Sequence, residues 1–367
     1  MLLLLAAGGA VAWSLLRGET PVPLGAKAEV ESAAKAVGGA QAASAPVAAA
    51  PRKTAAATKP ADQPAPNVVA GAVVKFAAPD VYPRSPASWF EAQVALARAG
   101  YSCGPIDGVG GAQTVAAWRA FQAQAGLAET SWLDPRTCAA LPLDGPATTK
   151  YTVTAADVAR LQPLSPTWLG KSQQSALDFE TLLELVAERS RVHPKLLREL
   201  NPGFAWEQAR AGAVVVVPAA ERTVSLAKAA ALHVQLEAHT LQAYDADGRL
   251  LAHFPVSIAK KAEKRPVGEL HVVVAAPNPN YTFDPEVFPE SPEAQELGRK
   301  LLLPPGPNNP VGVAWIGLDR TGYGIHGTPN PEQVGRTESH GCFRLANWDA
   351  RMLLDLVWVG MPVYVDP

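Results

Sequence analysis

Apolar residues recur at helical spacing over residues 84–144. The first run, SPASWFEAQVALARAG, begins with serines that favour a helix N-cap and ends at Gly100, a residue that favours helix termination. A turn containing Gly and Pro follows at 104–108, and a second run, TVAAWRAFQAQAG, has the same helical period. A third, shorter helix is expected near Pro135. The pattern predicts a small domain of three helices.

Residues 150–220 mix strand and helix signals. A short strand is expected at 151–153, and the run FETLLELVAERSRVHPKLLRELNPG predicts two helices separated by a turn at Pro194. The β-branched run VVVVP predicts a closing strand. This order indicates a small α/β module.

Strand signals dominate residues 222–367. The runs LHVQLEAHTLQAY and RLLAHFPVSI flank Asp247-Gly248, a dipeptide typical of a hairpin turn, and ELHVVVAA predicts a further strand. The run NWDARMLLDLVWVG predicts a helix from Asn347 to Gly360, before a final strand in MPVYV. We therefore expect a β-rich C-terminal domain and, for the whole chain, a multidomain α+β fold.

The first 80 residues differ in composition from the rest. Residues 1–17 are apolar up to Arg17, but the run is shorter than the roughly 20 residues of a spanning helix and lacks the basic start of a signal peptide. We interpret it as a membrane anchor or signal segment whose start omits upstream basic residues, with an ordinary buried segment as the alternative. Residues 18–80, rich in Ala and Pro, predict a disordered linker. These features favour an exported protein of the periplasm or cell envelope.

Charge and cysteine content narrow the possible functions. The formal net charge is −2, without basic clusters that carry interleaved aromatics, so no nucleic acid partner is expected. The three cysteines are Cys103, Cys138 and Cys342, and an odd count in an exported protein suggests one disulfide and one working thiol. We predict a disulfide between Cys103 and Cys138, which would stabilise the helical domain by roughly 3–4 kcal/mol. Two unpaired buried thiols are the alternative.

Two segments near the C-terminus contain residue types suited to nucleophilic catalysis, namely YGIHGT at 323–328 and SHGCFR at 339–344. A thiol with its ordinary pKa of about 8.5 is mostly protonated at neutral pH, so Cys342 needs a neighbouring base or cation to react. His326 is the candidate base, and Arg344 can stabilise a thiolate or bind a substrate carboxylate. Both require the fold to bring the two segments together.

These segments resemble the signature of the YkuD-type L,D-transpeptidase family, a His-Gly followed by Ser-x-Gly-Cys-x-Arg or Asn. Upstream, PPGPNNPVG at 304–312 looks like the family's loop ahead of the catalytic His. Pro266-x-Gly268 resembles the family's Thr-Pro-x-Gly turn, with Arg265 where Thr is common. The resemblance spans roughly 225–366.

The resemblance implies an acyl-transfer mechanism. The Cys342 thiolate would attack the carbonyl between the third and fourth residues of a peptidoglycan stem tetrapeptide, release D-Ala and form a thioester. An acceptor amine of another stem would then resolve the thioester into a 3→3 crosslink. His326 would act first as general base and then as general acid.

The same resemblance assigns further site residues. The carbonyl of Gly327 would orient the imidazole, and backbone N–H groups around Gly341 would stabilise the oxyanion of the acyl-transfer intermediate. Three more residues would shape the pocket or contact substrate: Ser339, His340 and Tyr323.

The N-terminal parts carry resemblances of their own. Residues 84–144 resemble a small peptidoglycan-binding domain, through Gly100-Tyr101, GPIDG and Phe121-Gln122. Residues 150–220 resemble a LysM glycan-binding module with Leu200-Asn201-Pro202 after the second helix. This segment carries an extra stretch after its first strand and lacks the usual Gly-Asp-Thr, so a structural adaptor is an equal alternative.

Two rival functions share these residues. Water could resolve the same thioester, giving an L,D-carboxypeptidase or endopeptidase, and a non-catalytic peptidoglycan-binding protein would not need Cys342 and His326. A zinc site of Cys342, His340 and His326 lacks a fourth ligand and the usual ligand spacing, so no metal and no cofactor are expected. The expected partners are peptidoglycan stem peptides and glycan, with inner-membrane anchoring left open. We expect a monomer.

Overall fold

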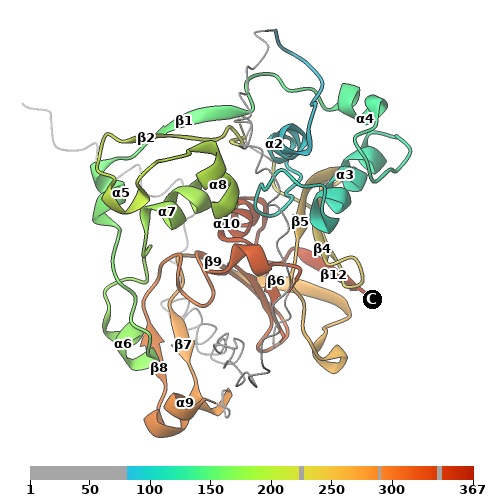
Figure 1. Ribbon diagram of the computed structural model, residues 1–367. Coiled ribbons are helices and arrows are strands. Elements are labelled where there is room, and N and C mark those ends of the chain that lie inside the picture. The colour runs from blue at the N-terminus through green and yellow to red at the C-terminus, as the bar shows by residue number, and fades with distance from the viewer. Residues whose placement is uncertain (1–80, 223–226, 288–290, 337–340) are drawn as a thin grey trace, which may run out of the picture.

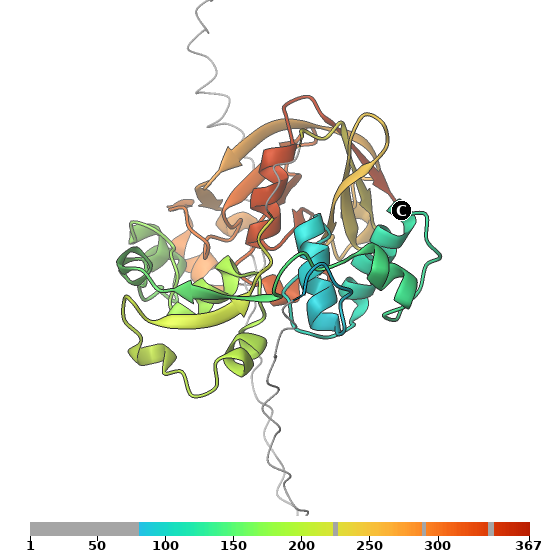
Figure 2. The same cartoon turned by 90° about the horizontal axis from the view of Figure 1, so that it is seen from above.

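The structure is a computed structural model that describes residues 81–222, 227–287, 291–336 and 341–367. A helical N-terminal part and a middle part of helices and two strands pack against a larger C-terminal domain built on a sheet (Figures 1 and 2). The predicted multidomain α+β fold is confirmed. Residues 1–17 and 18–80 lie outside the described residues, and no helix in the described part is long and apolar enough to cross a membrane.

The helical part has the three predicted helices. Ser88 caps the first helix by accepting a hydrogen bond from the Glu91 N–H, and Gly100 ends it at a φ of 96°, which favours glycine. Leu96 and Trp118, both fully buried, lie in the core of this part. The helices are α2 (Trp89–Ala99), α3 (Ala112–Gln124) and α4 (Pro135–Ala140).

The middle part has the predicted order of strand, helices and strand. Its first and last strands pair antiparallel. The Asn201 side chain donates to the carbonyls of Leu197 and Val216 and accepts from the Val216 N–H at 2.7 Å, so it ties the last helix to the last strand. Asn201 therefore has a structural role, and glycan binding by this part stays a prediction. The elements are β1 (Thr148–Thr152), α5 (Ala155–Ala159), α6 (Trp168–Gln173), α7 (Leu182–Arg189), α8 (Pro194–Leu200), η1 (Trp206–Gln208) and β2 (Val214–Pro218).

The C-terminal domain is built on a mixed eight-stranded sheet in the order β11-β10-β9-β6-β12-β3-β4-β5. The pairs β3–β12 and β10–β11 are parallel, and the others are antiparallel. The last helix, α10, buries Ala350, Leu353 and Leu356 against the sheet. The elements are β3 (Ala231–Gln235), β4 (Thr240–Tyr244), β5 (Leu250–Pro255), η2 (Ala262–Lys264), β6 (Gly268–Pro277), β9 (Ala314–Leu318), β10 (Gly324–His326), η4 (Pro331–Gln333), β11 (Phe343–Arg344), α10 (Asn347–Leu356) and β12 (Pro362–Asp366).

Two element boundaries differ from the sequence prediction. The run LHVQLEAHTLQAY forms two strands, β3 and β4, because the chain turns between them with His239 at a φ of 54°. The helix α10 starts at Asn347 as predicted but ends at Leu356 rather than at Gly360. Gly360 instead donates its N–H to the Val272 carbonyl at 2.7 Å, so pairing with β6 replaces the last helical turn.

A small lobe lies beside the sheet and is covered by the extra stretch of the middle part. In this lobe β7 (Tyr281–Phe283) pairs with β8 (Leu301–Leu303), and η3 (Pro285–Val287) and α9 (Pro292–Leu297) lie between them in the chain. Trp168 of α6 stacks on Phe283, with ring centroids 4.5 Å apart. The Leu177 N–H donates to Pro305 O, and Leu177 O accepts from the Asn308 N–H, both at 2.9 Å. The extra stretch, which the LysM pattern does not have, therefore packs against the lobe and bonds to the loop that follows it.

The helical part is joined to the C-terminal domain by hydrogen bonds. The Ser102 N–H donates to His253 O at 2.8 Å, and the His253 N–H donates to Gly100 O at 3.0 Å, so this segment extends the edge strand β5. The Ser102 hydroxyl also donates to the Asp349 carboxylate of α10 at 2.8 Å. The Ile106 N–H donates to Arg191 O, and Ile106 O accepts from the His193 N–H, so these bonds connect the helical and middle parts. The two accessory parts are thus docked on the C-terminal domain.

The predicted disulfide is not present. Cys103 and Cys138 are free, buried thiols within the core of the helical part. Cys103 Sγ makes only a long contact, 3.9 Å, to the Tyr101 carbonyl, and burial raises the pKa of both thiols. They behave as small core residues, because a domain docked on a larger neighbour already buries the apolar surface that a disulfide would otherwise support.

Candidate active site

Three neighbouring strands place side chains of the candidate site in one row. His326 of β10 lies opposite Trp315 of β9 and opposite Arg344 of β11 in the strand register. Residues directly opposite each other point to the same face of a sheet. Trp315, His326 and Arg344 therefore project from one face, and the Trp315 and His326 rings stack with centroids 5.7 Å apart.

Cys342 lies directly before β11, two residues from Arg344, so the strand period places it on the same face. It is fully buried in a cluster with Trp315 and with Tyr281 of the lobe. The intervening residue Phe343 instead packs in the core on the other face. The fold thus brings the two predicted segments together on one face of the sheet.

The His326 ring has a defined tautomer. Its Nδ1 lies 2.6 Å from the Gly327 carbonyl oxygen, and a carbonyl only accepts, so Nδ1 carries the proton. Nε2 is buried and has no hydrogen-bond partner among the described residues. Burial lowers the pKa of His326 to about 3, so the ring is neutral at physiological pH. Nε2 therefore holds a lone pair available to accept a proton.

The thiol of Cys342 is neutral for the same reason. Burial raises its pKa to about 12, while a hydrogen bond to the backbone at Gly324 and the charge of Arg344 act in the opposite direction. The Sγ atom lies 3.5 Å from the Gly322 carbonyl, to which the thiol donates. Resting Cys342 and His326 thus form a neutral acid and a neutral base, and Arg344 is the charge that favours the thiolate.

Gly341 and Tyr323 are adjacent in space. A Cβ built on Gly341 would lie 3.7 Å from Tyr323 Cε1, so the ring borders the backbone before the nucleophile. The Arg320 guanidinium lies over the Tyr323 ring, 4.8 Å from its centroid. Ser339 and His340 lie outside the described residues. Their predicted roles, like those of the other site residues, remain proposals.

Asn347 holds residues 304–313, the active-site loop that precedes β9. The Asn347 amide accepts from the Val313 N–H at 3.2 Å and donates to Pro307 O at 3.0 Å. It also donates to Glu188 of α7 at 2.8 Å. A side chain at Gly312, whose φ is 62°, or at Gly327 would collide with the Asn347 amide. The middle part therefore contacts the active-site loop through Glu188 and Asn347, in addition to the backbone hydrogen bonds of Leu177.

Sequence reasoning did not identify Asn347 or Glu188. The sequence predicts Asn347 only as the start of the last helix and indicates no role for Glu188. No local pattern indicates either role, because each depends on a contact between distant segments. Trp315 is buried, and its position against the His326 ring follows only from the strand register.

No group of three His, Cys, Asp or Glu residues suited to a metal ion occurs within the described ranges. The residues of the site instead match the needs of an acyl transfer by a thiol. These needs are a nucleophile, a base with a free lone pair and a fixed cation.

Comparisons with known proteins agree with this chemistry. Residues 229–365 match the YkuD family, described as an L,D-transpeptidase catalytic domain, and residues 85–141 match a family described as "Putative peptidoglycan binding domain". "Putative L,D-transpeptidase YkuD" of Bacillus licheniformis is 29% identical over 185 residues, which cover 50% of this chain and 93% of that protein. "Putative L,D-transpeptidase YqjB" of Bacillus subtilis is 32% identical over 124 residues, covering 32% of this chain and 61% of that protein.

Among solved structures, an L,D-transpeptidase from Xylanimonas cellulosilytica is 16% identical, covering 78% of this chain and 99% of that one, with a TM-score of 0.32. By these family matches, the chain contains a YkuD-family L,D-transpeptidase catalytic domain at residues 229–365 and a peptidoglycan-binding domain at residues 85–141.

Proposed function

We propose that the enzyme crosslinks peptidoglycan through a thioester on Cys342. The donor is a stem tetrapeptide, and the bond that breaks joins its third residue to the terminal D-Ala. The acceptor is the side-chain amine of a second stem, which gives a 3→3 crosslink. The observation that carries this proposal is the shared face on which the strand register places Cys342, His326 and Arg344.

The first half-reaction needs one proton transfer in each direction. His326 Nε2 takes the thiol proton while the sulfur attacks the carbonyl carbon, so a C–S bond forms and the carbonyl oxygen becomes an oxyanion. The imidazolium then gives its proton to the departing amine of D-Ala as the C–N bond breaks. The Nδ1–H bond to Gly327 O keeps the ring in the orientation that both transfers require.

The second half-reaction repeats these steps with the acceptor. The amine attacks the thioester, His326 removes a proton from the attacking nitrogen, and the thiolate leaves and is protonated again. Substrate binding excludes water from an already buried site, where the Arg344 charge offsets developing negative charge on sulfur more strongly than it would in water. Water in place of the amine would release a tripeptide instead, which is the carboxypeptidase reaction.

The accessory parts support an envelope location. A peptidoglycan-binding domain docked beside the catalytic sheet would hold the enzyme on its polymeric substrate, which lies in the cell envelope. This raises the local concentration of stems around the site without new catalytic contacts. The substrate partners are accordingly peptidoglycan stem peptides and glycan.

Intact-protein mass spectrometry tests the nucleophile. The enzyme is mixed with a disaccharide-tetrapeptide and quenched in acid, and we expect a mass increase equal to a disaccharide-tripeptide acyl group. Cys342→Ala should lack the adduct, whereas the matched control Cys138→Ala, which removes another buried thiol, should retain it. An adduct on Cys342→Ala, or its loss in Cys138→Ala alone, would show that the thioester forms elsewhere.

A further inference from the structure

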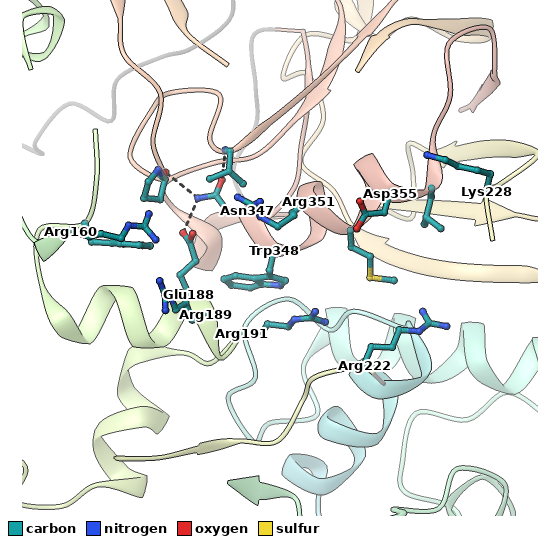
Figure 3. A pocket seen from close by; sticks show the side chains of 15 residues that line it. Arg160, Glu188, Arg189, Arg191, Arg222, Lys228, Asn347, Trp348, Arg351 and Asp355 are labelled. Carbon is teal, nitrogen blue, oxygen red and sulfur yellow. Dashed lines mark hydrogen bonds between the residues drawn. The ribbon is translucent and has the colours of Figure 1, made fainter. Parts of the chain in front are cut away.

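A cavity with a volume of about 1000 Å³ lies between the middle part and the catalytic domain (Figure 3), and its lining does not include Cys342. One wall comes from α7 and the residues after it, and the opposite wall comes from α10 with Trp348. The segment that connects β2 to β3 adds Arg222 and Lys228. The cavity thus exists only because the middle part is docked on the catalytic domain.

Basic side chains dominate the lining. Only two acidic residues, Glu188 and Asp355, face six basic ones, and Glu188 is engaged by the Asn347 amide. Two of the basic residues are neutralised locally, Arg160 by Asp178 at 2.8 Å and Arg189 by Asp157 at 2.7 Å. The basic residues are Arg160, Arg189, Arg191, Arg222, Lys228 and Arg351.

Arg191 and Arg222 are two of the four lining cations without an ion pair in the described ranges, although the buried Asp349 carboxyl lies within electrostatic range of Arg191. Neither side chain forms an ion pair with any residue in the described ranges. Within those same ranges, the Nε and Nη1 atoms of Arg222 are buried without a hydrogen-bond acceptor. Burial, and then the charge of Arg191, lower the pKa of Arg222, so the two guanidinium groups repel each other.

Such an arrangement is unfavourable for folding alone. Buried N–H donors without acceptors and neighbouring like charges both destabilise a fold, and such groups are rare in native proteins unless a partner satisfies them. Guanidinium groups present several donors in one plane, which matches the paired oxygens of phosphate and carboxylate groups. An anion with several oxygens is therefore the ligand chemistry that suits the guanidinium groups lining this cavity.

We propose that this cavity is a binding site for a multivalent oxyanion, a ligand with at least two phosphate or carboxylate groups, held chiefly by Arg191 and Arg222. Arg351 and Lys228 add positive charge on the α10 side (Figure 3). The planar Trp348 side chain lies between these basic groups and gives an apolar surface for the body of the ligand. None of its lining residues forms or breaks a bond in the proposed reaction, although Asn347 at the edge of the cavity also holds the active-site loop.

Isothermal titration calorimetry on the full chain tests the proposal, with inorganic pyrophosphate as the probe. We expect one saturable site that weakens as salt concentration rises. Arg191→Gln and Arg222→Gln should each weaken binding at least about tenfold. The matched control Arg119→Gln, at an exposed position of α3 outside the cavity, should bind like the wild type.

The Tm of each variant, measured without and with pyrophosphate, distinguishes a binding role of Arg222 from a purely structural one. Removing an uncompensated charge should leave Arg222→Gln at least as stable as the wild type, while pyrophosphate should raise Tm only in the wild type and the control. A clear loss of Tm in Arg222→Gln without ligand would mean that the residue supports the fold, and the proposal would be wrong. Equal pyrophosphate affinity in all variants, or no saturable binding at millimolar concentration, would also overturn it.

A competition experiment distinguishes two possible oxyanion ligands, a cell-wall carboxylate and a free phosphate compound. In Cys342→Ala protein, displacement of pyrophosphate by a disaccharide-tetrapeptide would assign the site to the carboxylates of the cell wall. Failure of that displacement, with pyrophosphate still bound, would assign it to a free phosphate-bearing ligand. Either result supports the oxyanion site, and neither depends on catalytic turnover.

Discussion

Asp349 provides a quantitative test of how the helical part is docked on the catalytic domain. Its carboxyl lies at the start of α10, is 1% exposed, and accepts a hydrogen bond from the Ser102 hydroxyl at 2.8 Å. Burial raises its pKa from the ordinary value of 3.8 to about 7, although the Ser102 bond and the charge of Arg191 act in the opposite direction. Cys103 lies near enough for the Asp349 charge to raise its thiol pKa.

The direction of the pH effect follows from this shift. Because the folded protein holds the proton more tightly than the unfolded chain, the contribution of Asp349 to stability is complete below about pH 4 and is lost as pH rises through about 7. The difference between a pKa of 3.8 and one of about 7 corresponds to about 4 kcal/mol of unfolding free energy. Glu188, whose pKa burial raises to about 7, adds a change of the same sign.

The perturbation is Asp349→Asn, which keeps an acceptor for Ser102 and removes the charge. We expect the variant to gain stability relative to the wild type as pH rises from 4 to 8, by about 4 kcal/mol across that interval. Any cost of placing the amide N–H is the same at both pH values and cancels. Urea unfolding monitored by tryptophan fluorescence at a series of pH values gives the two stability curves.

Asp247→Asn, in the exposed β4–β5 hairpin, is the matched control and should follow the wild-type curve. Parallel curves for wild type and Asp349→Asn would refute the reasoning, since they would mean that Asp349 titrates alike in the folded and unfolded chain. A variant that lost more stability than the wild type between pH 4 and pH 8 would refute even its sign.

Further predictions concern the active-site loop and the lobe. Asn347→Ala removes three hydrogen bonds and should lower the unfolding free energy by about 3 kcal/mol, measured by urea unfolding, and reduce kcat/KM with a donor stem. Unchanged values of both would contradict the positioning role. Trp168→Ala removes the stacked ring from Phe283 and should lower stability by about 3 kcal/mol, with Trp132→Ala, at an exposed position, as the neutral control. His326→Gln should abolish the acyl adduct in the mass-spectrometric assay while the near-ultraviolet circular dichroism stays native, and an adduct at the wild-type rate would exclude His326 as the base.

The sequence predicted most of the secondary structure because strong local signals coincided with the final packing. The helix α2 begins after Ser88 and ends before Gly100 as predicted, and Asp247-Gly248 forms the predicted hairpin turn. The boundaries that were wrong are those at which tertiary pairing overrides the local pattern. Gly360 follows a run with helical period, yet its backbone pairs with Val272 of β6 instead.

The candidate nucleophile and base were predictable because the residue types and their spacing match a family signature. Their arrangement was not, since only the parallel pairing of β10 with β11 places His326 and Cys342 on one face. The failed disulfide has a similar origin. The disulfide prediction assumes that the helical part is an isolated small domain. In the structure, Ser102 and Gly100 attach this part to the catalytic domain.

The most direct test of the central claim is the product analysis of donor stems. Wild-type enzyme and Cys342→Ala are each incubated with a disaccharide-tetrapeptide muropeptide, and the products are separated and identified by mass spectrometry. The account predicts dimers that have lost one Ala, formed by the wild type and absent with Cys342→Ala. Dimers formed equally by the variant, or tripeptide monomers as the sole product of the wild type, would contradict it.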